Sequence, residues 1–259
     1  MLKNIFRRRI KIKIGIINLM PIKTEVESQF STIFQKIDKN IELKYIYPVT
    51  HTYKNTCLNY IRENYIPLNN IKKENFDGFI ITGAPIEKYN FEEIDFWKEI
   101  DNFFKTNLLP SIYICWGAQS ALYSKFGIQK YELKKKLFGV YEHTIKTSNP
   151  FIQTDFQAPH SRNTFTKREC IKKAGLIILG ESKEAGVFIC SSKDYKDIFI
   201  FGHSEYQKER LKFEFERDQK EIPKNYFKED NPNNEILFSW ENHRDEFYKN
   251  WINFVGGNI

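Results

Sequence analysis

The chain has 259 residues, of which 41% are hydrophobic and 28% are charged, with 12 glycines and 9 prolines. This composition excludes collagen-like, low-complexity and disordered chains, and the length predicts one folded domain over residues 1–259. The formal net charge of +7 comes from basic residues scattered among acidic ones, which argues against nucleic-acid binding and is compatible with a small anionic ligand.

The start of the chain does not resemble a leader or a membrane anchor. Residues 1–9 form a short basic segment, and the apolar residues after it alternate with Lys11 and Lys13. No stretch approaches the roughly 20 apolar residues of a membrane span. The four cysteines form no Cys-x-x-Cys pair, and the histidines lack the spacing of metal ligands. We therefore expect a reduced cytoplasmic protein with no membrane association and no metal.

The first elements in chain order are a strand, a helix and a second strand. Residues 10–19 are β-branched and apolar, which predicts a strand. Thr24 and Glu27 have the spacing of a capping box, and apolar residues then recur at helical spacing over residues 24–37. Residues 41–49 predict the next strand.

The same alternation continues through the middle of the chain. The pattern predicts strands over residues 77–82 and 111–115, and helices over residues 91–104 and 117–126. Strands that alternate with helices form a mainly parallel sheet covered on both faces. The expected fold is therefore a flavodoxin-like three-layer α/β sandwich.

After residue 127 the periodicity weakens. The remaining predicted elements are two strands, a charged helix, a turn-rich stretch and an amphipathic helix, over residues 186–190, 198–201, 207–220, 223–232 and 241–255. No repeat or linker marks a second domain.

Three predicted strands end in unusual residues, at positions 83–85, 115–117 and 202–205. Ligands of doubly wound sheets bind beyond the carboxyl ends of the strands. Cys115 lies where a strand turns into a helix, and a helix N-terminus favours thiolate over thiol. Cys115 is therefore the candidate nucleophile.

A thiolate that attacks an acyl carbon needs a proton carrier and a group that orients the carrier. His203 and Glu205 supply both, because residues two apart on an extended strand end point the same way. The backbone amide of Trp116, with that of Gly83 or Ala84, is the candidate oxyanion hole.

Six motifs, taken together, resemble one family. They are NLMP, TGAP, CWGAQ, FGVYEH, APHSR and NYF, at residues 18–21, 82–85, 115–119, 138–143, 158–162 and 225–227. In this order they resemble the homoserine O-acyltransferases of methionine biosynthesis, the type built on the class I glutamine amidotransferase-like fold. The resemblance extends over nearly the whole chain.

The resemblance implies a double displacement. Cys115 takes an acyl group from acyl-CoA as a thioester and passes it to the hydroxyl of L-homoserine. His203 acts as the base in both halves, and Glu205 orients and stabilises its imidazole. Acyl-CoA is a co-substrate, so no bound cofactor is implied, and a homodimer is the family expectation.

The resemblance also assigns substrate residues. Lys136 and Arg217 lie at the family's substrate-binding positions, and arginine suits the carboxylate of homoserine. Ser161 lies at the position that lines the acyl pocket, and Lys23 has a supporting role. Glu87 lies at the position that selects the donor, where a glutamate fills space and repels a succinyl carboxylate. We therefore expect acetyl-CoA as the donor.

Three alternatives stay open. A succinyltransferase differs only at the acyl pocket, where Glu87 opposes it. A glutamine amidotransferase shares the Cys-x-Gly-x-Gln and His-x-Glu patterns, but commonly has glycine where this chain has Tyr113. A non-catalytic binding protein of the same fold would need no intact triad of Cys115, His203 and Glu205.

Overall fold

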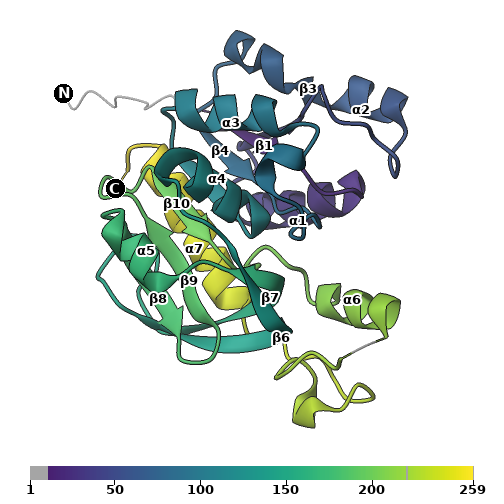
Figure 1. Ribbon diagram of the computed structural model, residues 1–259, viewed down its shortest axis with the longest axis vertical. Helices are drawn as coiled ribbons and strands as arrows, with labels where there is room; N and C mark the ends of the chain where they lie inside the picture. Colours follow the sequence, from purple (N-terminus) through teal and green to yellow (C-terminus); the bar gives the residue numbers. More distant parts are fainter. Residues whose placement is uncertain (1–10, 220, 259) are drawn as a thin grey trace, which may run out of the picture.

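The computed structural model describes residues 11–219 and 221–258, so the predicted basic segment 1–9 lies outside the described residues. In this part of the chain the strands are β1 Lys13–Ile17, β2 Glu42–Tyr47, β3 Ile66–Pro67, β4 Gly78–Ile81, β5 Ser111–Ile114, β6 Tyr131–Ile145, β7 Phe156–Phe165, β8 Ile177–Ser182, β9 Gly186–Ser191 and β10 Asp197–Ile200. They form one sheet in the order β3-β2-β1-β4-β5-β10-β9-β8-β6-β7 (Figure 1).

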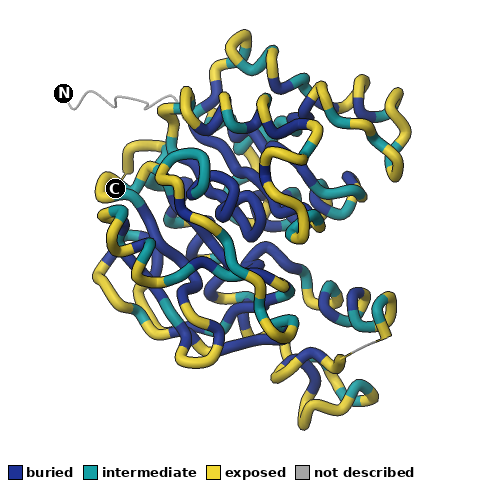
Figure 2. Tube along the Cα trace, viewed as in Figure 1, coloured by how far each residue is buried: buried dark blue, intermediate teal, exposed yellow. Residues whose placement is uncertain are grey.

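Helices cover both faces of this sheet. The α-helices are α1 Lys23–Ile37, α2 Leu58–Asn64, α3 Trp97–Thr106, α4 Trp116–Phe126, α5 Arg168–Lys173, α6 Arg210–Asp218 and α7 Glu241–Val255, and the short 3₁₀ turns are η1 Leu68–Lys73, η2 Phe91–Glu93 and η3 Lys228–Asp230. The apolar sides of α1 and α7 pack on one face, and those of α3 and α4 pack on the other. The dark blue sheet between yellow outer surfaces in Figure 2 shows these layers.

The sheet has a parallel half and an antiparallel half. Strands β3, β2, β1, β4, β5 and β10 run parallel, and β9, β8, β6 and β7 continue the sheet antiparallel. The prediction of a three-layer α/β sandwich with a mainly parallel sheet is confirmed. The carboxyl ends of β4, β5 and β10 meet at one edge, which brings the three unusual strand ends together.

The region after residue 127 differs from the prediction. It contains the two longest strands, β6 and β7, which pair antiparallel. The first half of β6 carries adjacent lysines at 134–136, and its pairing register shifts between Glu132 and Leu137. A run of like charges and a bulge both remove the two-residue alternation that identifies a strand.

The helix predicted over residues 24–37 is confirmed as α1, but its predicted capping box and the predicted start of the next helix are wrong. Helix α1 begins at Lys23, and its N-cap is Ile22 without a side-chain cap, so Thr24 and Glu27 form no capping box. The predicted helix over residues 91–104 is broken into η2 and α3. The break lies at Asp95, whose carboxylate accepts hydrogen bonds from the His51 ring and from a backbone amide of the neighbouring loop.

Helix α6 is shorter than the predicted helix over residues 207–220, whose last residue lies outside the described residues. It stands beside the end of the β6–β7 hairpin (Figure 1). Leu211 of α6 packs with Phe138, Tyr226 and Trp240 in a small apolar cluster. Gly139 of β6 has φ +140° and contacts the backbone of Lys224, so the hairpin also anchors the segment that follows α6.

Candidate active site

Cys115 occupies the turn between β5 and α4. Its backbone has φ 52° and ψ −114°, a conformation that L-residues rarely adopt and that is held where function needs it. The Cys115 amide donates to the carbonyl of Ile200 over 2.7 Å, which ties the turn to β10. A Cβ at Gly117 would lie 2.6 Å from the Thr82 carbonyl oxygen, so only glycine lets the helix start this close to β4. The turn aims the thiol away from the sheet.

His203 and Glu205 lie in a turn after β10. The Tyr206 amide donates to the His203 carbonyl over 3.2 Å, so the segment is not the extended strand end that we predicted. The predicted pair still forms, with 2.7 Å between Nδ1 of His203 and Oε1 of Glu205. Both side chains are buried, and the His203 amide donates to the Pro159 carbonyl over 2.9 Å. The tight turn therefore brings the His203 and Glu205 side chains together, although we predicted that an extended backbone would do so.

The charges around His203 favour its protonated form. Burial alone would lower the pKa of His203, but the Cys115 sulfur and the Glu205 carboxylate outweigh burial and raise this pKa well above its usual range. A hydrogen bond between the imidazole and the sulfur adds to the effect. The imidazole of His203 is therefore charged and lies between the Cys115 sulfur and the Glu205 carboxylate, as the predicted triad requires.

The predicted oxyanion-hole residues lie beside the nucleophile. A Cβ built on Gly83 would lie 3.2 Å from Cβ of Cys115 and 3.6 Å from Cε1 of His203. Trp116 is the first residue of α4, so its amide has no carbonyl partner within the helix. Gly83 and Ala84 both line the pocket in front of the thiol. The role of these amides stays a prediction.

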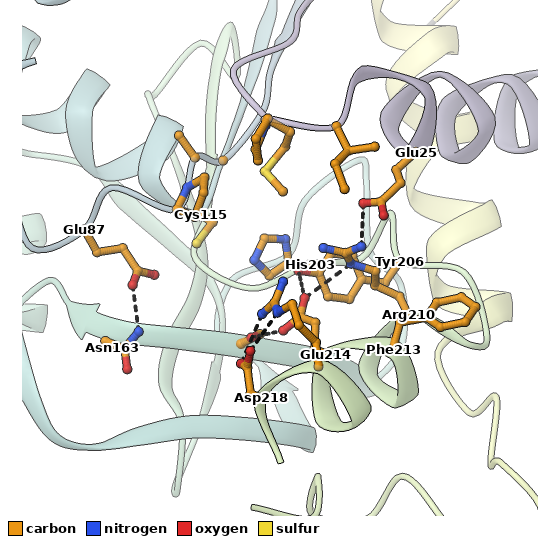
Figure 3. Close-up of a pocket in the computed structure, with 18 of the residues that line it drawn as sticks. Glu25, Glu87, Cys115, Asn163, His203, Tyr206, Arg210, Phe213, Glu214 and Asp218 are labelled. Atoms are coloured by element: carbon orange, nitrogen blue, oxygen red, sulfur yellow. Dashed lines mark hydrogen bonds and ion pairs between the residues drawn. The ribbon is translucent and has the colours of Figure 1, made fainter. Parts of the chain in front are cut away.

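The pocket above Cys115 has a volume of about 290 Å³ and brings most of the predicted site residues together (Figure 3). Its lining combines the loops after β1 and β4 with one side of β7 and one face of α6. The lining residues are Met20, Pro21, Ile22, Glu25, Gly83, Ala84, Pro85, Glu87, Cys115, Lys136, Ser161, Asn163, His203, Tyr206, Arg210, Phe213, Glu214, Arg217 and Asp218.

Lys23 is not part of this lining. It is buried, its Nζ donates to the Asn18 carbonyl over 2.6 Å, and it lies 5.1 Å from the centroid of the Tyr53 ring. Burial lowers the pKa of Lys23 to about 7, although the charge of Glu27 opposes this shift. The structure therefore places Lys23 beneath the loop that forms one rim of the pocket, where it supports the loop from inside.

A buried carboxylate that sequence reasoning missed lies at the centre of the pocket. Glu214 accepts hydrogen bonds from Ser161 Oγ and, over 2.9 Å, from Tyr206 Oη. Its oxygens lie 3.3 Å from Nε of Arg210 and 3.7 Å from Nζ of Lys136. Burial raises the pKa of Glu214, but the Ser161 hydrogen bond and the cations outweigh it, and the net pKa is lowered.

The sequence contains only a weak signal for the group of charged residues around Glu214. Arg210, Glu214 and Arg217 are three or four residues apart, which places them on one face of a helix. A charged helix face usually points to solvent, and only the approach of β7 shows that this one faces a pocket.

Tyr206 connects the buried Glu214 to His203, the candidate base. Its ring stacks on the His203 imidazole, with 4.3 Å between centroids and 15° between planes. Its hydroxyl donates to Glu214, so one side chain contacts both the base and the buried carboxylate. No sequence pattern identified this residue.

Glu87 lies on the other side of the pocket from Glu214 and Arg210 (Figure 3), and Arg217 also lines the pocket. The Arg217 guanidinium is mostly exposed and makes a two-pronged contact with Asp218, at 2.6 and 3.0 Å. The carboxylate of Glu87 accepts a hydrogen bond from Asn163 Nδ2 over 2.8 Å. The pocket therefore has a polar side rich in paired charges and another side lined by Glu87 and Asn163.

Over residues 11–219 and 221–258 the structure contains no group of three or more histidine, cysteine, aspartate or glutamate side chains arranged to hold a metal ion. In the same residues no helix has both the length and the apolar character needed to cross a membrane.

Comparisons with known proteins identify relatives along nearly the whole chain. "Homoserine O-acetyltransferase 2" of Ilyobacter polytropus is 50% identical over 245 residues, which are 95% of this chain and 86% of that protein. Proteins named homoserine O-acetyltransferase from Acetivibrio thermocellus and Clostridium acetobutylicum are each 40% identical over 256 residues, or 94% of this chain, with 84% and 85% of the relatives covered.

Solved structures share the fold at low identity. A glutamine amidotransferase from Thermotoga maritima superposes with a TM-score of 0.64 at 15% identity, covering 95% of this chain and 98% of that one. One from Methylobacillus flagellatus gives a TM-score of 0.62 at 11% identity, with 93% of each chain covered. The predicted glutamine amidotransferase-like fold is confirmed. A model of the homoserine O-succinyltransferase family matches residues 5–258, and with this match the resemblance seen in the six motifs is confirmed: the chain belongs to that family.

Proposed function

We propose that this protein is a homoserine O-acetyltransferase, which moves an acetyl group from acetyl-CoA to the hydroxyl of L-homoserine through a thioester on Cys115. The observation that carries the proposal is the strained turn at Cys115 beside the buried His203 and Glu205 pair. The names of relatives at 40 to 50% identity support the same reaction.

In the first half-reaction the Cys115 thiolate attacks the carbonyl carbon of acetyl-CoA. The amides of Trp116 and Gly83 or Ala84 stabilise the oxyanion that develops on the carbonyl oxygen. The carbon–sulfur bond to CoA breaks, and the departing thiolate takes the proton of the His203 imidazolium. Acetyl-Cys115, neutral His203 and CoA are the products.

In the second half-reaction His203 removes the proton of the homoserine hydroxyl as its oxygen attacks the thioester carbon. The bond to Cys115 sulfur breaks, which returns the thiolate and the imidazolium. Through its 2.7 Å contact Glu205 stabilises the imidazolium, which is present before the first half-reaction and again after the second. The product is O-acetyl-L-homoserine, and the starting charges are restored.

The polar side of the pocket suits an amino acid. The buried carboxylate of Glu214 is a receptor for the ammonium group of homoserine, and Arg217 and Lys136 are receptors for its carboxylate. In the ligand-free arrangement Asp218 occupies the Arg217 fork. Binding therefore exchanges one carboxylate partner of Arg217 for another, which keeps the charge count of the pocket unchanged.

The donor is acetyl-CoA because of Glu87. Its carboxylate, held by Asn163, projects into the pocket on the side opposite the polar cluster. A succinyl group would bring a second carboxylate toward it, and two unscreened like charges repel. The succinyltransferase alternative is therefore disfavoured by charge as well as by space.

The test is intact mass after the protein is mixed with acetyl-CoA or succinyl-CoA in the absence of homoserine. We expect one acetyl adduct that homoserine discharges and that Cys115→Ala does not form. Glu87→Gly should gain a succinyl adduct while its acetyl adduct is retained. A succinyl adduct on the unaltered chain would overturn the donor assignment. Glutamine hydrolysis without any adduct would instead support the amidotransferase alternative.

The predicted homodimer and the predicted cytoplasmic location stay predictions. Sedimentation velocity at micromolar concentration tests the first, because a dimer of this chain has twice the mass of 31.0 kDa.

A further inference from the structure

A second pocket adjoins the catalytic one. It has a volume of about 540 Å³ and lies between the loop after β2 and the loops after β1 and β4. Met20, Pro21, Ala84 and Pro85 line both pockets, so the two share one rim above Cys115. Leu19, Ile86 and Phe96 make much of its wall apolar.

The walls of this adjoining pocket are held in place by the protein itself. The Tyr53 hydroxyl donates to the Pro48 carbonyl over 2.8 Å, and its ring stands edge-on to His51 at 4.6 Å. His51 is in turn fixed by Asp95 at 2.9 Å. Glu99 accepts the backbone amide of Val49 over 2.8 Å. The loop after β2 is therefore preorganised, as binding sites usually are.

The acyl donor does not fit the catalytic pocket alone. That pocket has about half the volume of its neighbour, and Glu214, Lys136 and Arg210 fill its polar side with paired charges. The arm of acyl-CoA that carries the thioester is long, with two amide groups between short hydrocarbon stretches. Such a chain matches a mainly apolar wall interrupted by a few polar groups.

Charge at the adjoining pocket suits the phosphate end of the same ligand. Lys54 is exposed and lines the pocket, and within the described residues its ammonium group makes no ion pair. The one carboxylate in the lining, Asp95, is already engaged by His51 and by the amide of Thr52. The pocket therefore offers an anionic ligand one exposed ammonium group that has no ion-pair partner in the described part of the chain.

We propose that the adjoining pocket binds the pantetheine arm of the acyl-CoA donor, which passes over the shared rim to present its thioester to Cys115. Lys54 interacts with the phosphates at the far end of the arm. This inference rests on the proposed acyl-CoA reaction. It separates the donor site from the homoserine site, and the two sites adjoin at the shared rim beside Cys115.

The experiment compares acetyl-CoA with S-acetyl-N-acetylcysteamine, a truncated donor that keeps the thioester but lacks most of the arm and all phosphates. Thr52→Trp fills the pocket from an exposed position, and Lys54→Glu reverses the charge. We expect each variant to raise KM for acetyl-CoA about tenfold and to leave KM for the truncated donor within about twofold.

Matched controls lie at the opposite edge of the sheet. Thr106→Trp at the end of α3 and Lys193→Glu in the turn between β9 and β10 make the same changes on exposed residues. They should change neither KM. Equal effects on both donors, or none, would refute the adjoining pocket as the donor site. Failure of either donor to acetylate Cys115 would instead refute the underlying reaction.

Discussion

At the scale of single residues, the His203 imidazole is held from two directions. Glu205 contacts its Nδ1 at the ring edge, and Tyr206 stacks on its face. The Tyr206 hydroxyl continues to Glu214, the proposed receptor for the homoserine ammonium group. The proposed base is thereby connected to the proposed homoserine site through one rigid aromatic side chain, and positioning of this kind supports general base catalysis.

Substitutions of Tyr206 should separate its two roles. Tyr206→Phe keeps the stacked ring and removes the hydrogen bond to Glu214, so we expect a several-fold higher KM for homoserine with an unchanged rate of Cys115 acetylation. Tyr206→Leu also removes the stack and should slow both half-reactions about tenfold. Single-turnover mass measurements and steady-state kinetics distinguish these outcomes. Equal behaviour of the two variants would show that the hydrogen bond alone matters.

At the scale of elements, the β6–β7 hairpin and α6 build the polar side of the pocket, which is the proposed side of the acceptor homoserine and is called the acceptor side below. Lys136 comes from β6, Ser161 from β7 and Glu214 from α6. The segment after α6 is attached to the hairpin where the Val140 amide donates to the Lys224 carbonyl over 2.8 Å. This attachment is possible because residue 139 is a glycine.

Gly139→Ala should therefore damage the acceptor site selectively. Gly139 has φ +140°, and an added Cβ would lie 2.4 Å from the Lys224 carbonyl oxygen. We expect a loss on the order of 2 kcal/mol in unfolding free energy and a raised KM for homoserine, with acetylation of Cys115 retained.

Gly127→Ala is the matched control, since Gly127 also has a positive φ but no atom lies within 4 Å of its added Cβ. It should cost about 1 kcal/mol from backbone strain and leave KM unchanged. Urea unfolding and steady-state kinetics measure both effects. A normal homoserine KM in a folded Gly139→Ala protein would contradict the role given to the attachment.

At the scale of the whole molecule, the two halves of the sheet contribute different parts of the pocket. The parallel half supplies the Cys115 turn and the loops at the shared rim, and the antiparallel half supplies the acceptor side. A group of buried histidines comes from β6 and β7 of the antiparallel half and from α7. His143 and His160 are 3.0 Å apart between Nε2 atoms, and His243 stacks on Phe156 with 3.8 Å between centroids.

These histidines should make the fold sensitive to acid. Burial lowers the pKa of His143 and of His243 to about 3, from about 6.5 in the unfolded chain. Between these values the unfolded state binds more protons, so stability is full above pH ~6.5 and falls as the pH falls toward 3. His203, whose pKa is raised, acts in the opposite sense.

His243→Phe removes one such group and keeps an aromatic ring against Phe156. We expect the loss of unfolding free energy between pH 7 and pH 5 to be smaller in this variant by about 2 kcal/mol than in the unaltered protein. Because His203 is present in both proteins, its contribution cancels. Urea titrations at the two pH values measure the difference, and parallel pH dependences would show that His243 is not neutral in the fold.

Much of the fold, and the grouping of Cys115, His203 and Glu205, could be predicted from the sequence by itself. Buried parallel strands leave short apolar runs, and the residues that follow these runs identified Cys115, His203 and the loop at Gly83. Local chemistry suffices for such features, because a strand end, a helix start and a spacing of two residues are encoded in adjacent positions.

The tertiary structure alone decided the acceptor side. The adjacent lysines of β6 kept this strand from being recognised in the sequence. The sequence of α6 also does not distinguish the buried Glu214 from exposed charged neighbours such as Glu216. Burial and pairing of a charge depend on which distant segments approach it, here β7 and Tyr206. The spacing of residues within α6 does not predict these partners, because contacts such as the one between Ser161 and Glu214 join residues far apart in the chain.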